Sequence, residues 1–138
     1  MNIIQKEEAL IEEFNLFTDW MEKYEYIIEL GKELQVIEDE EKTDSRLIEG
    51  CQSKVWLISE CIGDRMVFKA DSEAIITKGI IALLIRVLNN EHPQDIARAN
   101  LDFIDKIGLK EHLSPTRSNG LNGMIRKIKM ESIKNIQG

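Results

Sequence analysis

The chain has 138 residues, 43% of them apolar and 31% charged, and its 25 acidic against 18 basic side chains give a formal net charge of −7. This apolar content excludes a disordered acidic tail and predicts one globular domain over residues 1–138. The acidic balance argues against binding driven by phosphate charge, and two cysteines exclude both a disulfide scaffold and a four-cysteine zinc site.

The beginning of the chain contains neither the basic segment nor the apolar core of a secretory signal. We therefore predict a cytoplasmic protein whose cysteines stay reduced. Charge is distributed unevenly: residues 1–45 carry a net −10, residues 46–116 a net −1 and residues 117–138 a net +4. The basic C-terminal segment is suited to three counterparts, namely nucleic acid, an acidic partner, or the acidic face of the chain itself.

The first third of the chain predicts two amphipathic helices. Apolar residues recur at helical spacing at Ile3, Leu10, Phe14 and Phe17. A second stripe follows Thr18, a candidate N-cap, and consists of Trp20, Tyr24, Ile27, Ile28, Gly31 and Leu34. Residues 38–45 contain no apolar side chain, so we expect an exposed connection there.

An antiparallel hairpin is predicted in the middle of the chain. From Val55 the apolar pattern changes to a period of two, which is typical of a strand. Gly63-Asp64 is a turn signal, and the alternation resumes over residues 65–71. The short apolar run Leu47-Ile48 predicts a further strand ahead of the hairpin.

Residues 74–88 predict a buried central helix, capped by Asp71 or Ser72. Eleven of these 15 residues are aliphatic, and only Lys78 and Arg86 are charged. The segment is shorter than the roughly 20 residues that cross a bilayer, so we predict no membrane association. Lys78 either has a functional role or extends its ammonium group to water.

Two prolines mark further helix starts. Pro93 opens a short helix, and Ser114-Pro115 opens a final one that continues toward Ile133. Gly120 and Gly123 lie inside that helix, where each costs about 0.5 to 1 kcal/mol relative to alanine. They indicate either a close backbone contact or a later helix start. The order of elements predicts an α+β fold with a small antiparallel sheet packed against helices.

Most catalytic templates are missing from the sequence: there is no phosphate-binding loop, no dinucleotide-binding glycine motif and no His-Glu-x-x-His. The metal-ligating side chains His92, His112, Cys51 and Cys61 include no close pair, so we predict no metal site. The segment 120–123 is similar to the glycine loop that clamps nucleic-acid backbones, but it lies in a predicted helix.

The two cysteines lie in different contexts. Cys61 occupies a strand position, as a small apolar residue would. Cys51 lies between Gly50 and Lys54 in a polar segment just ahead of the strand, where glycine frees the backbone and lets the thiol project from a loop. We expect Lys54 to lower the pKa of Cys51 and so increase its thiolate fraction. Two interpretations of Cys51 stay open, a reactive thiol and a loop thiol without a chemical role.

A single mobile cysteine suits sulfur transfer. Neither a histidine nor an acid is next to Cys51 in the sequence to complete a hydrolytic triad. Accepting sulfur needs only a thiolate that attacks the terminal sulfur of a donor persulfide and releases the donor thiolate. A second cysteine nearby would displace that sulfur, so we expect Cys61 to lie away from the loop. We also predict that the Cys51 thiol is sheltered until the protein docks on its donor.

Four segments, in order along the chain, resemble the SufE family, the sulfur-acceptor proteins of iron–sulfur cluster assembly. The most specific is Gly50–Trp56, with the sequence GCQSKVW, and the others are Tyr24–Gly31, Asp71–Gly79 and His112–Leu121. The resemblance runs from about Tyr24 to Lys129. It implies an α+β fold similar to the IscU scaffold.

The resemblance also implies a function. A SufE-like protein takes persulfide sulfur from a pyridoxal-phosphate (PLP)-dependent cysteine desulfurase of the SufS type, stimulates that enzyme, and passes the sulfur to the SufB-containing SufBCD complex. It is a carrier and activator rather than a stand-alone enzyme, and it needs no cofactor of its own, because the PLP belongs to the desulfurase. A homodimer and the choice of desulfurase system stay open.

The same motifs imply the site residues. Cys51 matches the acceptor cysteine, and its loop frame consists of Gly50, Gln52 and Lys54. Arg117 is either a contact for the partner or the cysteine loop, or a solvated residue at a helix start. Glu73 is either a desulfurase contact or an acid that stabilises a helix N-terminus.

The sequence leaves two rival functions open. One is an adaptor that only reshapes a desulfurase, with Cys51 incidental. The other is nucleic-acid binding through the basic C-terminal residues, which are Arg117, Arg126, Lys127, Lys129 and Lys134.

Overall fold

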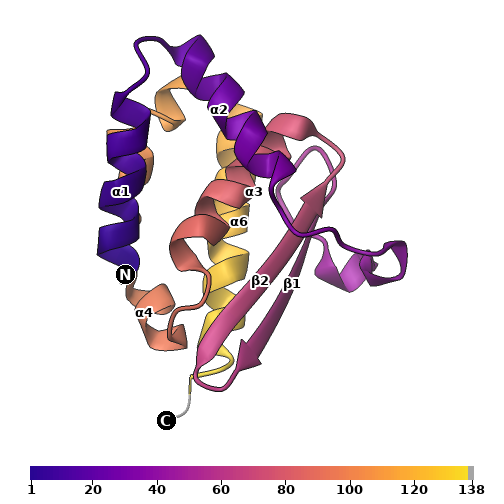
Figure 1. The fold of residues 1–138 in the computed structure, drawn as a ribbon. Helices are drawn as coiled ribbons and strands as arrows, with labels where there is room; N and C mark the ends of the chain where they lie inside the picture. Colours follow the sequence, from indigo (N-terminus) through magenta and orange to yellow (C-terminus); the bar gives the residue numbers. More distant parts are fainter. Residues whose placement is uncertain (137–138) are drawn as a thin grey trace.

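The computed structural model describes residues 1–136 and has the predicted α+β architecture, with a two-stranded antiparallel sheet packed against helices (Figure 1). The strands are β1 (Val55–Ile62) and β2 (Arg65–Ser72). The helices are α1 (Ile3–Asn15), α2 (Trp20–Lys32), α3 (Ile75–Leu88), α4 (Pro93–Arg98), α5 (Phe103–Lys106) and α6 (Pro115–Ile133). Short 3₁₀ helices occupy Asp39–Glu41, Asp44–Arg46 and Lys110–His112.

The N-terminal helices form where the apolar stripes predict them. The Asn2 side chain caps α1 by accepting a hydrogen bond from the backbone amide of Gln5 at 2.8 Å. In turn, the Gln5 side-chain oxygen accepts a hydrogen bond from the backbone amide of Asn2. The cap of α2 is Asp19, which accepts from the amide of Glu22 at 2.9 Å. The expected cap, Thr18, lies one residue too early and instead donates its hydroxyl to the Glu22 carboxylate at 2.6 Å.

The predicted hairpin is confirmed, with Leu57 opposite Ala70 and Cys61 opposite Met66. The strand predicted at 47–48 is wrong, because only Leu47 forms an isolated bridge to Trp56. The 3₁₀ helix that ends at Arg46 and the turn that follows Ile48 leave no length for a strand.

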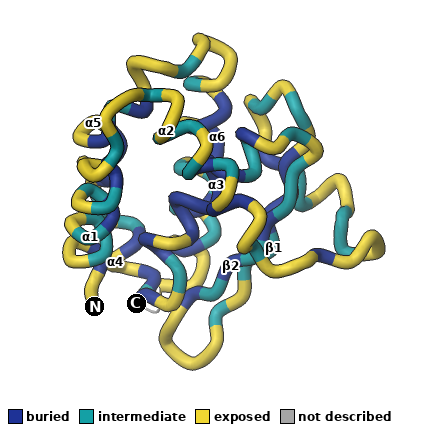
Figure 2. Tube along the Cα trace, turned by 45° about the horizontal axis from the view of Figure 1, so that its top comes forward, coloured by how far each residue is buried: buried dark blue, intermediate teal, exposed yellow. Residues whose placement is uncertain are grey.

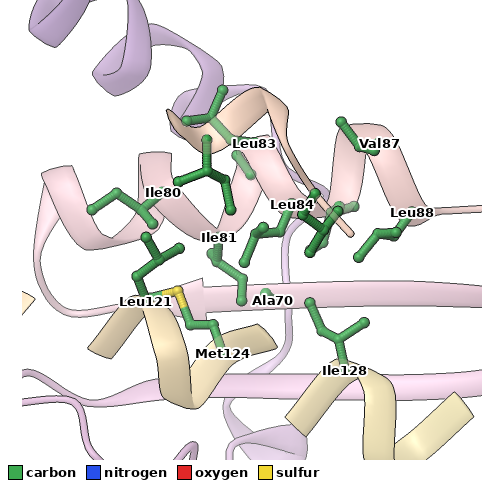
Figure 3. Packing of buried hydrophobic residues seen from close by; sticks show 14 of the residues in the cluster. Ala70, Ile80, Ile81, Leu83, Leu84, Val87, Leu88, Leu121, Met124 and Ile128 are labelled. Atoms are coloured by element: carbon green, nitrogen blue, oxygen red, sulfur yellow. The ribbon is translucent and has the colours of Figure 1, made fainter. Parts of the chain in front are cut away.

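Helix α3 lies at the centre of the molecule and is buried over most of its length (Figure 2). Figure 3 shows that α3 faces both β2, which carries Ala70, and α6. The apolar side chains of α3 form one buried cluster with Ala70 and with Leu121, Met124 and Ile128 of α6. Burying one side chain of this size stabilises the fold by about 1.5 to 3 kcal/mol. The packing fixes the first turns of α3 and α6 side by side. Across residues 1–136, no helix is both long and apolar enough to cross a membrane.

The start of α3 differs slightly from the prediction. Its N-cap position is Ala74, whose amide donates to Ser72 Oγ at 3.2 Å. Asp71 does not cap the helix, because its carboxylate accepts from the Ser72 amide at 2.8 Å.

Candidate functional site

The loop that carries Cys51 lies against the first turns of α3 and α6. The thiol lines a small pocket of about 80 Å³. Its walls come from three segments far apart in sequence. The cysteine loop contributes Gln52 and Ser53, the start of α3 contributes Ala74, Thr77 and Ile80, and α6 contributes Thr116, Arg117, Gly120 and Met124. The pocket therefore depends on the tertiary packing of both helices.

The Cys51 thiol is half-buried and donates a hydrogen bond to the carbonyl oxygen of Gly120, with Sγ and oxygen 3.6 Å apart. Burial raises the pKa of Cys51 above its ordinary value of 9.0, because a thiolate loses hydration in the pocket. The expectation that Lys54 lowers this pKa is wrong. The Lys54 side chain is exposed, and desolvation sets the direction of the shift.

Two glycines let the cysteine loop approach α6 closely. A Cβ atom on Gly120 would lie 3.3 Å from Cys51 Sγ, and a Cβ atom on Gly123 would overlap the carbonyl oxygen of Glu49. Of the two explanations offered for these glycines, the close backbone contact is confirmed. The later helix start is wrong, because α6 begins at Pro115.

Backbone geometry shapes both ends of the loop. Gly50 has φ +93, a left-handed conformation that favours glycine. At the other end, the carbonyl oxygen of Lys54 accepts from Ser72 Oγ at 2.9 Å and from the Glu73 amide at 3.1 Å. Lys54 and Glu73 therefore contribute backbone groups to the loop frame, and both of their side chains are exposed.

An ion-pair network lies beside this frame. The Asp71 carboxylate is 3.0 Å from Lys42 Nζ and 3.2 Å from Lys78 Nζ. Lys42 also lies over the Trp56 ring, 5.3 Å from its centroid. Lys78 therefore pairs with a carboxylate rather than only extending to water, and the network joins the acidic connection to the hairpin and to α3.

Arg117 and Cys51 line the same pocket, although 66 positions of sequence numbering separate them. The Arg117 amide donates to Ser114 Oγ at 3.2 Å, which caps α6, and the residue is exposed. Of the expected site residues, Cys51, Gln52 and Arg117 meet at the pocket, whereas Gly50, Lys54 and Glu73 do not line it.

The site residues expected from the sequence did not include six residues that line this pocket, which are Ser53, Ala74, Thr77, Ile80, Thr116 and Met124. A signal was available for two of them. Thr77 is one of three polar residues in a mostly apolar helix, and Thr116 follows the Ser114-Pro115 helix start. Only the packing of α6 against α3 brings Met124 to the pocket.

Cys61 lies at the other end of the hairpin from Cys51. Strand β1, of 8 residues, separates them by about 20 Å at the usual rise per residue. A disulfide needs Cα atoms within about 7 Å, so the two thiols do not pair in this fold. Across residues 1–136, no group of three or more His, Cys, Asp or Glu side chains is placed to hold a metal ion.

The basic C-terminal segment is partly neutralised within the chain. Lys127 and Lys134 each lie 3.3 Å from the Glu131 carboxylate, and Lys129 donates to the carbonyl oxygen of Ala99. Because these basic side chains are paired within the chain, fewer positive charges are free to bind nucleic acid than the sequence alone suggests.

Comparison with known proteins defines the class: this is a domain of iron–sulfur metabolism. The SufE family model, described as "Fe-S metabolism associated domain", matches residues 8–132. The chain therefore belongs to the SufE family, and it has a role in Fe–S metabolism.

Relatives support this membership over nearly the whole chain. The chain is 37% identical over 130 residues to an uncharacterized SufE-like protein of Rhizobium meliloti (strain 1021), covering 91% of this chain and 93% of the relative. It is 36% identical to an uncharacterized SufE-like protein of Rhizobium etli, and the match covers 91% of this chain and 88% of the relative. The solution structure of a hypothetical protein from Thermus thermophilus has the same fold, with a TM-score of 0.77, 18% identity and 94% of both chains covered.

Proposed function

We propose that this protein accepts sulfur on Cys51 from the persulfide of a PLP-dependent cysteine desulfurase in the cytoplasm. It then delivers the sulfur to a SufB-containing SufBCD complex. One observation carries the proposal: in a SufE-family chain, Cys51 lies on a loop at a pocket that two helix N-termini enclose.

The transfer step needs no cofactor on this chain. The Cys51 thiolate attacks the terminal sulfur of the donor persulfide, the donor sulfur–sulfur bond breaks, and a new Cys51 persulfide forms. The donor cysteine leaves as a thiolate and takes up the proton that Cys51 lost. The step is an exchange of sulfur between two thiols, so it requires neither an oxidant nor a reductant.

The resting geometry favours a protected thiol. Burial raises the pKa of Cys51, which keeps the thiol protonated, and its hydrogen bond to Gly120 holds it in the pocket. The attacking thiolate therefore forms when docking changes the environment of the loop. Gly50, with φ +93, provides a backbone position at which the loop can turn.

The pocket also suits the product. Its volume of about 80 Å³ exceeds the roughly 10 to 15 Å³ that one water molecule needs, so one additional sulfur atom can be sheltered beside Cys51. Sheltering protects a persulfide from other thiols. The distance to Cys61 serves the same purpose, because a nearby thiol would displace the sulfur and leave a disulfide.

Removing sulfur from the donor accounts for stimulation of the desulfurase, because the donor cysteine becomes free for the next turnover. The adaptor hypothesis attributes stimulation to contact alone. Alanine release by the desulfurase from cysteine distinguishes the two. We expect wild-type protein and Cys61→Ser to stimulate release equally, and Cys51→Ser to lose the stimulation. Full stimulation by Cys51→Ser would overturn the proposal in favour of the adaptor.

A further inference from the structure

A second thiol lines a separate and larger pocket at the opposite end of the hairpin. This pocket has a volume of about 260 Å³, and its lining includes Cys61, Asp64, His92, Pro93, Gln94 and Asn135. It joins the end of β1, the turn between the strands, the start of α4 and the turn that follows α6. It shares no lining residue with the Cys51 pocket.

Two consecutive carbonyl groups of the turn hold the thiol and an imidazole on this pocket. Cys61 Sγ donates to the carbonyl oxygen of Gly63 at 3.6 Å, and His92 Nδ1 lies 3.0 Å from the carbonyl oxygen of Asp64. The Asp64 carboxylate is 3.4 Å from the same nitrogen. The thiol, the imidazole and the carboxylate are thus ordered by the same tight turn.

The partners of His92 determine its tautomer. A carbonyl oxygen only accepts hydrogen bonds, so Nδ1 carries the proton that points to Asp64. In the neutral ring the lone pair is then on Nε2, which makes that atom a proton acceptor. The His92 side chain is 33% exposed, so the base is accessible from solvent.

We propose that Cys61, His92 and Asp64 form a second thiol site, at which Cys61 forms a mixed disulfide with a small polar disulfide. Cys61 sulfur attacks one sulfur of the disulfide, and the sulfur–sulfur bond of that molecule breaks. His92 takes the thiol proton, directly or through a water, and gives it to the leaving thiolate. One new disulfide replaces the old one, so the small disulfide is the only oxidant that the step consumes.

The lining favours a peptide-like ligand. Gln94 and Asn135 present amide groups that both donate and accept hydrogen bonds, which suits the amides and carboxylates of a small thiol peptide. The volume of the Cys61 pocket is about three times that of the Cys51 pocket. The two thiols are therefore adapted to different partners, one to a single transferred sulfur atom and the other to a small molecule.

Oxidised glutathione is the probe that tests this site. The full chain is incubated with it near pH 7, the adduct of about 305 Da is followed by intact mass, and peptide mapping locates it. We expect one adduct on Cys61 in the wild type and none in Cys61→Ser. His92→Gln should slow the reaction about tenfold, because a positioned general base then no longer takes the thiol proton. Asp64→Asn should slow it less.

The control is His112→Gln, which removes the other histidine and should react at the wild-type rate. Far-UV circular dichroism establishes that each variant is folded. An adduct that forms first on Cys51 would overturn the proposal. So would an unchanged rate in both His92→Gln and Asp64→Asn, because Cys61 would then react only as an exposed thiol.

Discussion

The thiol of Cys51 donates a hydrogen bond to the carbonyl oxygen of Gly120, 3.6 Å away and 69 positions later in the chain. This contact joins the cysteine loop to α6 and leaves the thiol half-buried. The space for it depends on the absence of a side chain at position 120, where a Cβ atom would lie 3.3 Å from the sulfur. The protection of Cys51 is therefore a property of the packing between two segments distant in sequence.

Replacing Gly120 with alanine should expose the thiol without unfolding the protein. The new methyl group displaces a mobile side chain rather than backbone, and alanine favours the helix by about 0.5 to 1 kcal/mol. We expect Cys51 in Gly120→Ala to react severalfold faster with iodoacetamide, as measured by peptide mass mapping. The matched control is Asn122→Ala on the exposed side of α6, which should react at the wild-type rate. Slower alkylation in Gly120→Ala would contradict the assigned contact.

Replacing Gly123 with alanine should destabilise the protein. In Gly123→Ala the methyl group meets the Glu49 carbonyl oxygen, which is backbone and cannot rotate away. We expect a loss of about 1 to 3 kcal/mol in the free energy of unfolding, measured by urea denaturation, despite the better helix propensity of alanine. Asn122→Ala again serves as the control. Stabilisation of Gly123→Ala would show that the loop does not approach α6 this closely.

Local sequence signals were sufficient for most elements of the fold. The period of two from Val55, the aliphatic run over 74–88 and the proline helix starts at 93 and 115 all correspond to observed elements. These features depend on neighbouring residues, which the sequence displays directly. The strand expected at 47–48 failed because the flanking turns, rather than the apolar pair, decide the backbone there.

The candidate site was only partly predictable. The motif around Cys51 and the unusual glycines at 120 and 123 were visible in the sequence. That these two segments contact each other could not be seen there. The direction of the Cys51 pKa was predicted wrongly, because a nearby lysine in sequence says nothing about burial. The pocket residues Thr77 and Met124 come from helices that only the tertiary fold brings to Cys51.

The raised pKa of Cys51 has a measurable pH dependence. Because burial disfavours the thiolate, the midpoint of the alkylation rate should lie above the ordinary value of 9.0 in the folded protein. It should fall toward that value in urea. Measuring iodoacetamide rates across pH in Cys61→Ser isolates the Cys51 reaction. A folded-state midpoint below the unfolded one would mean that charge, rather than desolvation, controls this thiol.

The ion pairs of Asp71 should stabilise the fold above acidic pH. Burial alone raises the pKa of Asp71, but hydrogen bonds from Lys42, from the Ser72 amide and from Lys78 outweigh it and lower the pKa below 3.8. A group with a lowered folded-state pKa stabilises above its unfolded pKa and loses that contribution as the pH falls through the folded value. We expect Asp71→Asn to lose about 1 kcal/mol at pH 7, with a smaller difference below about pH 4.

Thermal or urea unfolding of Asp71→Asn and wild type at pH 7 and pH 3 tests this. The control is Asp39→Asn, which removes an exposed carboxylate 3.7 Å from the same Lys42 and should change stability little. A difference between Asp71→Asn and wild type that stayed constant or grew toward pH 3 would contradict the assigned ion pairs.

The central claim is that Cys51 carries the transferred sulfur, and intact mass tests it most directly. The protein is incubated with a cysteine desulfurase and cysteine and is measured under non-reducing conditions. We expect a gain of about 32 Da for each sulfur, removed by dithiothreitol, present in Cys61→Ser and absent in Cys51→Ser. The absence of any gain while desulfurase turnover is still stimulated, or a gain that persists in Cys51→Ser, would contradict the account.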